Sequence, residues 1–213
     1  MSDPIKVDIW SDVQCPWCYI GKRKFESGIA AFGRPVEVEY HSFELAPDTP
    51  VDFDGTPVDY LSARKGIPVD QVHEMLARVT GIAAEVGLDY HFDAVQQTNT
   101  RKAHELLHFA KAQGKQSEVK ELLLKAYFVD GEHVGKLETL ADIAAEAGLD
   151  PADALRSLEQ GEFADAVEAD VQQAVALGIQ GVPFYVIDGM YGISGAQPAE
   201  VFAQALEQAF AER

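Results

Sequence analysis

The tetrapeptide Cys15-Pro16-Trp17-Cys18 constrains this chain more than any other feature of its sequence. It follows an apolar segment, residues 5–10, that predicts a strand, and it opens a stretch that predicts a helix over residues 15–32. These are the only two cysteines among 213 residues. Two thiols separated by two residues at a strand-to-helix junction suit reversible dithiol–disulfide chemistry. One thiol attacks a disulfide, and the other resolves the mixed disulfide that forms.

The helix start assigns different roles to the two thiols. The first backbone N–H groups of a helix lack partners within the helix, and the helix dipole places partial positive charge there. We therefore expect Cys15 to be the attacking thiol, with a pKa depressed to about 5–7. Pro16 suits the first helical position, where a missing N–H costs nothing. Cys18 lies one turn further along the same face and is the expected resolving thiol.

Three other interpretations of the cysteine pair remain open. The thiols could be inert buried side chains, half of a zinc site, or a static disulfide. The first does not explain their pairing around Pro16-Trp17 at a helix start. The last would close a loop too short to constrain the unfolded chain strongly. Redox chemistry is the favoured interpretation.

Composition and charge limit the partners of the chain. The formal net charge is −18 and the pI is near 4.5, which argues against nucleic acid and anionic membranes as partners. No secretory signal precedes the first strand, and no segment is long and apolar enough to span a bilayer. We therefore expect a cytoplasmic protein, in which a Cys-x-x-Cys pair is more often catalytic than structural.

The order of predicted elements indicates an α/β fold with an all-helical insertion. The strand and helix at the N-terminus lead to a second strand at residues 36–43, and strands return at 184–187 and 190–194 around an Asp188-Gly189 hairpin turn. A final helix starts near Pro198. Helices are predicted between these two parts at 68–87, about 99–114, 117–130, 137–148, 151–160 and 162–178. We expect residues 1–55 and 175–213 to form one discontinuous domain and residues 56–174 to form the helical domain.

One octamer nearly repeats within the helical part. Residues 82–89 return as residues 143–150 with a single substitution, Val86 to Ala147. The flanking sequences are not similar, so a shared helix ending, with glycine in the left-handed conformation, is the better interpretation than duplication.

Further motifs give the chain a family resemblance. Gly181-Val182-Pro183-Phe184 precedes the third predicted strand, Ser194-Gly195-Ala196-Gln197 precedes the last helix, and residues 99–104 read Asn-Thr-Arg-Lys-Ala-His. With the Cys-Pro-Trp-Cys sequence, these segments resemble the DsbA-like branch of the thioredoxin fold, and in particular its FrnE-type members. The resemblance covers nearly the whole chain. It implies a thiol:disulfide oxidoreductase that acts on protein or peptide thiols and disulfides without a metal or organic cofactor.

The same resemblance implies roles for the residues around the dithiol. Pro183 is expected to be cis and to lie beside Cys15. Gly181 would permit an unusual backbone conformation, and the backbone at Gly181 and Val182 would pair with an extended peptide substrate. Trp17 is expected either to form an apolar rim for that peptide or merely to pack.

The chain departs from periplasmic DsbA proteins in one respect. Those proteins place a histidine between the cysteines, whereas Pro16-Trp17 carries no charge. Asp12 would oppose a thiolate at Cys15. Strongly oxidising behaviour is therefore not expected.

Two other functions stay open beside disulfide exchange. Kappa-class glutathione transferases and 2-hydroxychromene-2-carboxylate isomerases share this fold but typically have serine where this chain has Cys15. Retention of both thiols argues against that activity and leaves glutathione as a candidate reductant. A non-catalytic peptide-binding chaperone is the third possibility.

The segment from His104 to His108 matches the H-E-x-x-H pattern of zinc metalloproteases. That pattern is short and often accidental, and Arg101 and Lys111 suggest that the two histidines belong to a partly exposed polar rim. His41, His73, His91 and His133 show no ligand spacing. The sequence therefore predicts no metal site.

Overall fold

The computed structural model describes residues 3–213, which divide into two compact units. The first unit ends at Leu45 and resumes at Ala166, and the second is Ala46–Asp165. The sequence placed these boundaries about ten residues later. Most of helix α8 (Ala164–Ala176) belongs to the first unit, because Asp170 accepts a hydrogen bond from the backbone N–H of Ser42 at 2.8 Å.

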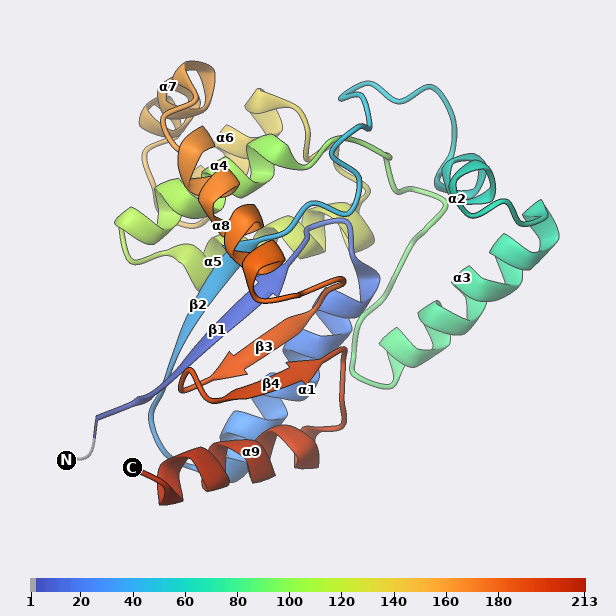
Figure 1. The fold of residues 1–213 in the computed structure, drawn as a ribbon. Helices are drawn as coiled ribbons and strands as arrows, with labels where there is room; N and C mark the ends of the chain where they lie inside the picture. Colours follow the sequence, from blue (N-terminus) through green and yellow to red (C-terminus); the bar gives the residue numbers. More distant parts are fainter. Residues whose placement is uncertain (1–2) are drawn as a thin grey trace. The chain divides into compact units, whose positions relative to one another are not determined.

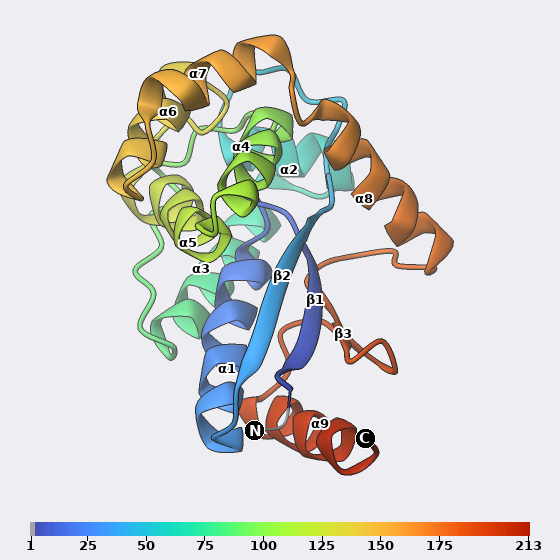
Figure 2. The same cartoon turned by 90° about the vertical axis from the view of Figure 1, so that its left-hand side faces the viewer.

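The first unit contains a four-stranded sheet with the order β2-β1-β3-β4 (Figure 1). Its strands are β1 (Ile5–Ser11), β2 (Val36–Ser42), β3 (Phe184–Ile187) and β4 (Tyr191–Ser194). β1 pairs with β2 in parallel, while β3 is antiparallel to both β1 and β4. The two parallel strands run side by side next to α1 in Figure 2. The predicted strand–helix–strand and hairpin–helix halves are thus both present.

Alternating residues of β1 face two different layers. Val7 and Ile9 pack with α1 (Pro16–Phe32) and α9 (Ala199–Ala211), which supply Phe25 and Phe202. Trp10 points to the opposite face and packs against Ala174 of α8 and against Ile179. This layering follows from the two-residue period of a strand whose two faces are both covered.

Two turns are built as their glycines require. Gly33 ends α1 in the left-handed conformation, with φ 69°, and its N–H donates to the carbonyl of Ile29. Asp188 and Gly189 both have positive φ, 52° and 69°, which is the backbone that a two-residue hairpin of this hand needs. The predicted helix end and the predicted hairpin are confirmed.

The described part of the second unit is helical. Its elements are α2 (Pro57–Lys65), α3 (Val69–Ala84), α4 (Arg101–Ala112), α5 (Gln116–Lys125), the π-helix η1 (Ala126–Asp130), α6 (Leu137–Glu146) and α7 (Pro151–Gln160). The single helix predicted over 117–130 is wrong in its last turn, where the backbone widens into η1.

The repeated octamer is confirmed as a shared helix ending. Gly87 and Gly148 have φ values of 78° and 81°. The N–H of Leu88 reaches back five residues to the carbonyl of Ala83, and Leu149 makes the same bond one repeat later. These are the bonds of a glycine-terminated helix, so the similarity reflects local backbone chemistry.

Candidate active site

The two cysteines lie at the start of α1, shortly after the end of β1. Cys15 is the N-cap residue of α1, Pro16 occupies the first helical position, and the N–H of Cys18 donates to the Cys15 carbonyl at 3.0 Å. Both cysteines are free thiols and both are buried, with 4% and 3% of their surfaces exposed. The spacing therefore places two reduced thiols in the first turn of one helix, as predicted.

The loop before β3 meets the first thiol. The Sγ of Cys15 donates a hydrogen bond to the backbone carbonyl of Val182 at 3.5 Å. The peptide bond between Val182 and Pro183 is cis, as the resemblance implied. Residues separated by 167 positions in sequence are thus brought together at the dithiol.

Gly181 does not use the left-handed backbone that glycine permits. Its φ lies outside that region, and a Cβ built on it meets no atom within 4 Å. Val182 and Gly181 are both half-buried, so part of the loop backbone still reaches the surface.

The electrostatics of the site oppose a thiolate at Cys15. A hydrogen bond with Cys18 raises the pKa of the Cys15 thiol most, and burial raises it further, to well above its ordinary value of 9.0. The carboxylate of Asp12 pushes the pKa in the same direction, whereas the backbone of Cys18 opposes the rise. The expectation of a depressed pKa is wrong, because the enclosed thiol loses more from burial and from its thiol neighbour than it gains from the helix start.

Asp12 is a buried carboxylate that organises the loop between β1 and α1. Its Oδ2 accepts from the backbone N–H of Leu45 at 2.8 Å, and its side chain also contacts Gln14. The N–H of Cys15 approaches the Asp12 carbonyl at 3.4 Å. Asp12 therefore ties the residues after β2 to the dithiol loop while it disfavours negative charge on Cys15.

Gly21 is a site residue that the sequence did not single out. A Cβ on Gly21 would lie 2.5 Å from the hydroxyl of Tyr185 and 3.1 Å from Cγ of Pro183. Burial, followed by the negative potential of Cys18, raises the pKa of Tyr185 well above its usual value, so this hydroxyl stays protonated. A glycine inside an otherwise helical pattern is the signal that could have revealed this close approach.

Trp17 stands apart from the other residues of the tetrapeptide. Its side chain is 39% exposed, whereas Cys15 and Cys18 are enclosed. An exposed indole next to a dithiol supplies apolar surface to any chain that approaches it.

The H-E-x-x-H segment is buried rather than a polar rim. His104, Glu105 and His108 of α4 expose 0%, 3% and 8% of their surfaces, and Glu105 pairs with Lys102 at 3.0 Å. Within residues 3–213, no group of three His, Cys, Asp or Glu ligand atoms lying within 4.8 Å of one another includes either histidine. The expected partly exposed rim is therefore wrong.

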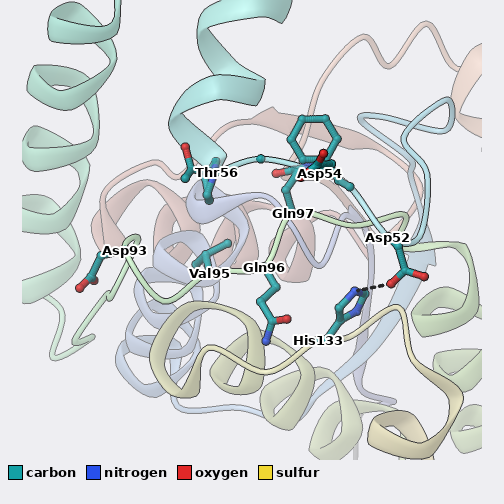
Figure 3. A pocket seen from close by; sticks show the side chains of 11 residues that line it. Asp52, Asp54, Thr56, Asp93, Val95, Gln96, Gln97 and His133 are labelled. Atoms are coloured by element: carbon teal, nitrogen blue, oxygen red, sulfur yellow. Dashed lines mark ion pairs between the residues drawn. The ribbon is translucent and has the colours of Figure 1, made fainter.

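A hollow of about 460 Å³ lies in the second unit (Figure 3). Asp52, Asp54 and Asp93 contribute carboxylates to its lining, and His133 approaches Asp52 at 3.6 Å. Neither cysteine lines it. The lining is acidic, and Lys136 already pairs with the carboxylate of Asp52.

One structural feature bears on membranes. Within the part of the chain that the structure describes, none of the helices has both the length and the apolar character that crossing a bilayer requires.

Comparison with known proteins gives consistent similarities. The family model described as a DSBA-like thioredoxin domain matches residues 6–207. An uncharacterised protein of Bacillus subtilis, YwbO, is 30% identical over 204 residues, covering 95% of this chain and 96% of that protein. The chain therefore shares its whole domain with these proteins.

Solved structures agree with this result. A probable DsbA oxidoreductase from Streptomyces coelicolor is 40% identical, with a TM-score of 0.92 over 98% of this chain and 91% of that chain. The cytosolic disulfide reductase DsbM from Pseudomonas aeruginosa is 16% identical, with a TM-score of 0.70 over 98% of this chain and all of its own. At that lower identity the likeness concerns the fold alone. The predicted α/β fold, a thioredoxin fold with a DsbA-like helical insertion, is confirmed.

Proposed function

This chain belongs to the DsbA-like thioredoxin domain family, and we propose that it is a thiol:disulfide oxidoreductase in which Cys15 and Cys18 exchange disulfides with protein or peptide substrates. The observation that carries the proposal is the contact between the Cys15 thiol and the Val182 carbonyl. It places the Cys15 thiol beside a loop whose backbone reaches the surface at Gly181. A dithiol that did not bind a substrate would not need a loop backbone beside Cys15.

The exchange balances with two thiols and one substrate disulfide. Cys15, as its thiolate, attacks one sulfur of the disulfide, forms a mixed disulfide and releases a substrate thiolate. Cys18 then attacks the Cys15 sulfur, which forms the Cys15–Cys18 disulfide and releases the second substrate thiol. The two protons of the dithiol end on the substrate. The reverse sequence oxidises a substrate dithiol.

The raised pKa of Cys15 favours the reducing direction. DsbA is a strong oxidant because its reduced form is stabilised by a thiolate. In this chain the hydrogen bond with Cys18 and burial favour the protonated thiol, so the reduced form lacks that stabilisation. The enzyme we propose therefore reduces substrate disulfides more readily than it introduces them.

The substrate would bind beside the exposed side chain of Trp17. An extended peptide would pair with the backbone at Val182 and Gly181, as in strand addition, while its apolar side chains contact Trp17. Pro16 would hold the start of α1, and Pro183 would hold the loop against Cys15. No metal or organic cofactor takes part in the steps that we propose, and neither nucleic acid nor a membrane is a partner.

We place this enzyme in the cytoplasm and among the FrnE-type members of the family. A cytosolic compartment would keep the dithiol reduced, which suits a reductase. Glutathione is our candidate for the thiol that regenerates the reduced pair. DsbM, which has the same fold, is known in a structure with glutathione.

The test is turnover of a disulfide-bonded peptide that carries a fluorophore and a quencher, with glutathione as reductant. Wild type should release the fluorophore, Cys15→Ser should lose at least 100-fold in rate, and Cys18→Ser should accumulate a mixed disulfide. Equal turnover by wild type and the Cys15→Ser, Cys18→Ser double variant would contradict the proposal.

A glutathione-dependent isomerase is the second candidate, since a 2-hydroxychromene-2-carboxylate isomerase has this fold at 15% identity with a TM-score of 0.67. The Cys15→Ser variant separates the two functions. This variant should lose disulfide exchange. A 2-hydroxychromene-2-carboxylate isomerase would instead keep or gain its isomerase activity with serine at position 15. A chaperone would suppress aggregation equally well without either thiol.

A further inference from the structure

Two carboxylates and an imidazole converge on the sheet face that bears Trp10. Asp8 of β1 lies directly opposite Glu39 of β2 in the parallel register, and His41 follows two residues later on the same face. One ligand atom from each of these three side chains lies within 4.8 Å of the others. We call this group the Asp8–Glu39–His41 cluster.

A fourth side chain orients the imidazole. Asp170 of α8 places Oδ1 2.8 Å from Nδ1 of His41, and its Oδ2 accepts from the N–H of Ser42. The Nδ1–H of His41 therefore donates to Asp170, and Nε2 is left facing Asp8 at 2.9 Å and Glu39 at 3.5 Å. A histidine that binds a metal through one nitrogen usually donates the other N–H to a carboxylate in this way.

We propose that the Asp8–Glu39–His41 cluster binds one divalent first-row transition ion, such as Zn²⁺, through Nε2 of His41 and one oxygen from each carboxylate. Water would complete the coordination. Bonds of about 2.0–2.2 Å in a tetrahedral site separate neighbouring ligand atoms by about 3.3–3.6 Å. The observed separations from Nε2, 2.9 and 3.5 Å, therefore need shifts of only a few tenths of an ångström.

Positive charge already gathers at this cluster. Nζ of Lys6 lies 3.3 Å from Asp8 and 3.4 Å from Glu39, and the Lys6 side chain is 49% exposed. A metal ion bound by Asp8 and Glu39 would take the place of this ammonium, and the exposed Lys6 side chain would move into water.

Titration with Zn²⁺ tests the site in the Cys15→Ser, Cys18→Ser double variant, because the dithiol itself would bind zinc. Calorimetry in a non-chelating buffer should show one ion per chain. Asp8→Asn and Glu39→Gln should each weaken binding at least tenfold, since each removes one anionic ligand. Lys6→Met should tighten it, because a competing cation is gone while every ligand remains.

Asp52→Asn is the matched control. Asp52 also lies near a histidine, His133 at 3.6 Å, but outside the cluster. Its loss should leave the Zn²⁺ affinity unchanged.

The position of the ion has an independent readout. The rings of Trp10 and His41 stack with centroids 4.5 Å apart. In a Trp17→Phe background, Trp10 is the only tryptophan left, and paramagnetic Co²⁺ bound at His41 should quench its fluorescence.

The outcomes are decisive in both directions. Absence of Zn²⁺ binding, or binding that Asp8→Asn and Glu39→Gln leave unchanged, would overturn the proposal. Because Lys6→Met keeps all three ligands, its tighter binding would support the site independently of any loss of folding in the Asp8 and Glu39 variants.

Discussion

The thiol of Cys15 donates a hydrogen bond to the backbone carbonyl of Val182 at 3.5 Å, across 167 residues of sequence. This contact joins the start of α1 to the loop before β3, so the sulfur that we propose as the nucleophile and the backbone that we propose as the substrate-binding edge lie at one site. The same enclosure that creates the contact also disfavours charge on the sulfur. Reactivity and reduction potential should therefore both reflect a protonated resting thiol.

We expect the Cys15–Cys18 pair to be a reductant. Its reduction potential should lie nearer to the thioredoxin value of about −270 mV than to the DsbA value of about −120 mV. The reason is that the reduced form gains no stability from a Cys15 thiolate. Equilibration with glutathione redox buffers, followed by mass spectrometry of the alkylated protein, gives the value. A potential close to that of DsbA would refute this expectation.

Alkylation of Cys15 should be slow at neutral pH and should accelerate as the pH rises through and above 9.0, the ordinary thiol pKa. Cys18→Ala should lower the pKa of Cys15, because it removes the side-chain hydrogen bond that raises it most. Asp12→Asn should lower it by less. Iodoacetamide rates over pH 6–11, measured by peptide mapping, provide the test, with Asp188→Asn as the control. An alkylation rate of Cys15 that has already reached its maximum at pH 7 would contradict the raised pKa.

The same pKa shift links folding to alkaline pH. The pKa of Cys15 is higher in the folded chain than in the unfolded chain, so the folded state holds its proton more tightly. The resulting stability is fully present below pH 9.0 and is lost as the pH rises through the folded pKa. Urea unfolding at pH 8 and pH 10 should show a smaller alkaline loss for Cys15→Ser than for wild type. An equal loss of stability in wild type and in Cys15→Ser would argue against a raised pKa of Cys15 in the folded chain.

Gly21→Ala should destabilise the protein by about 1–3 kcal/mol, since its Cβ would clash with the Tyr185 hydroxyl in a packed layer. Gly81→Ala is the control in α3, because a Cβ there meets no atom within 4 Å. It should stabilise by about 0.5–1 kcal/mol through helix propensity. Tyr185→Phe should relieve part of the Gly21→Ala penalty. Denaturant unfolding measures all of these variants, and similar effects at Gly21 and Gly81 would show that the close approach is unimportant.

Asp170→Ala should cost about 3–5 kcal/mol of stability, because it leaves His41 without its buried partner. The N–H of Ser42 would lose its acceptor as well. Asp170→Asn should cost less, since an amide oxygen can still accept from Ser42. Thermal and denaturant unfolding of the two variants give the comparison, and a neutral Asp170→Ala would show that α8 is held mainly by apolar packing.

The sequence predicted local elements well because their causes are local. Cys15-Pro16-Trp17-Cys18 marked a helix start, Asp188-Gly189 marked a hairpin, and the glycines at 87 and 148 marked helix ends. Each depends on backbone chemistry within a few residues. The contact between Cys15 and Val182 was expected only from the family resemblance, since no periodicity connects positions 167 apart.

The features that the sequence did not predict depend on the register between strands and on the burial of side chains. The Asp8–Glu39–His41 cluster exists because the parallel register sets position 8 against position 39. The predicted direction of the pKa shift of Cys15 was wrong, because the sequence indicates the position of Cys15 at a helix start but not its burial. His104 and His108 were expected near solvent for the same reason, whereas both side chains are buried.

Trapping of the mixed disulfide tests the central claim most directly. The Cys18→Ser variant should be incubated with a disulfide-bonded peptide, and the linkage should be mapped by mass spectrometry of the unreduced digest. Our account predicts one peptide per chain, bound through Cys15, with no adduct on the Cys15→Ser variant. An adduct through Cys18 in the Cys15→Ser variant, or no adduct on either variant, would contradict it.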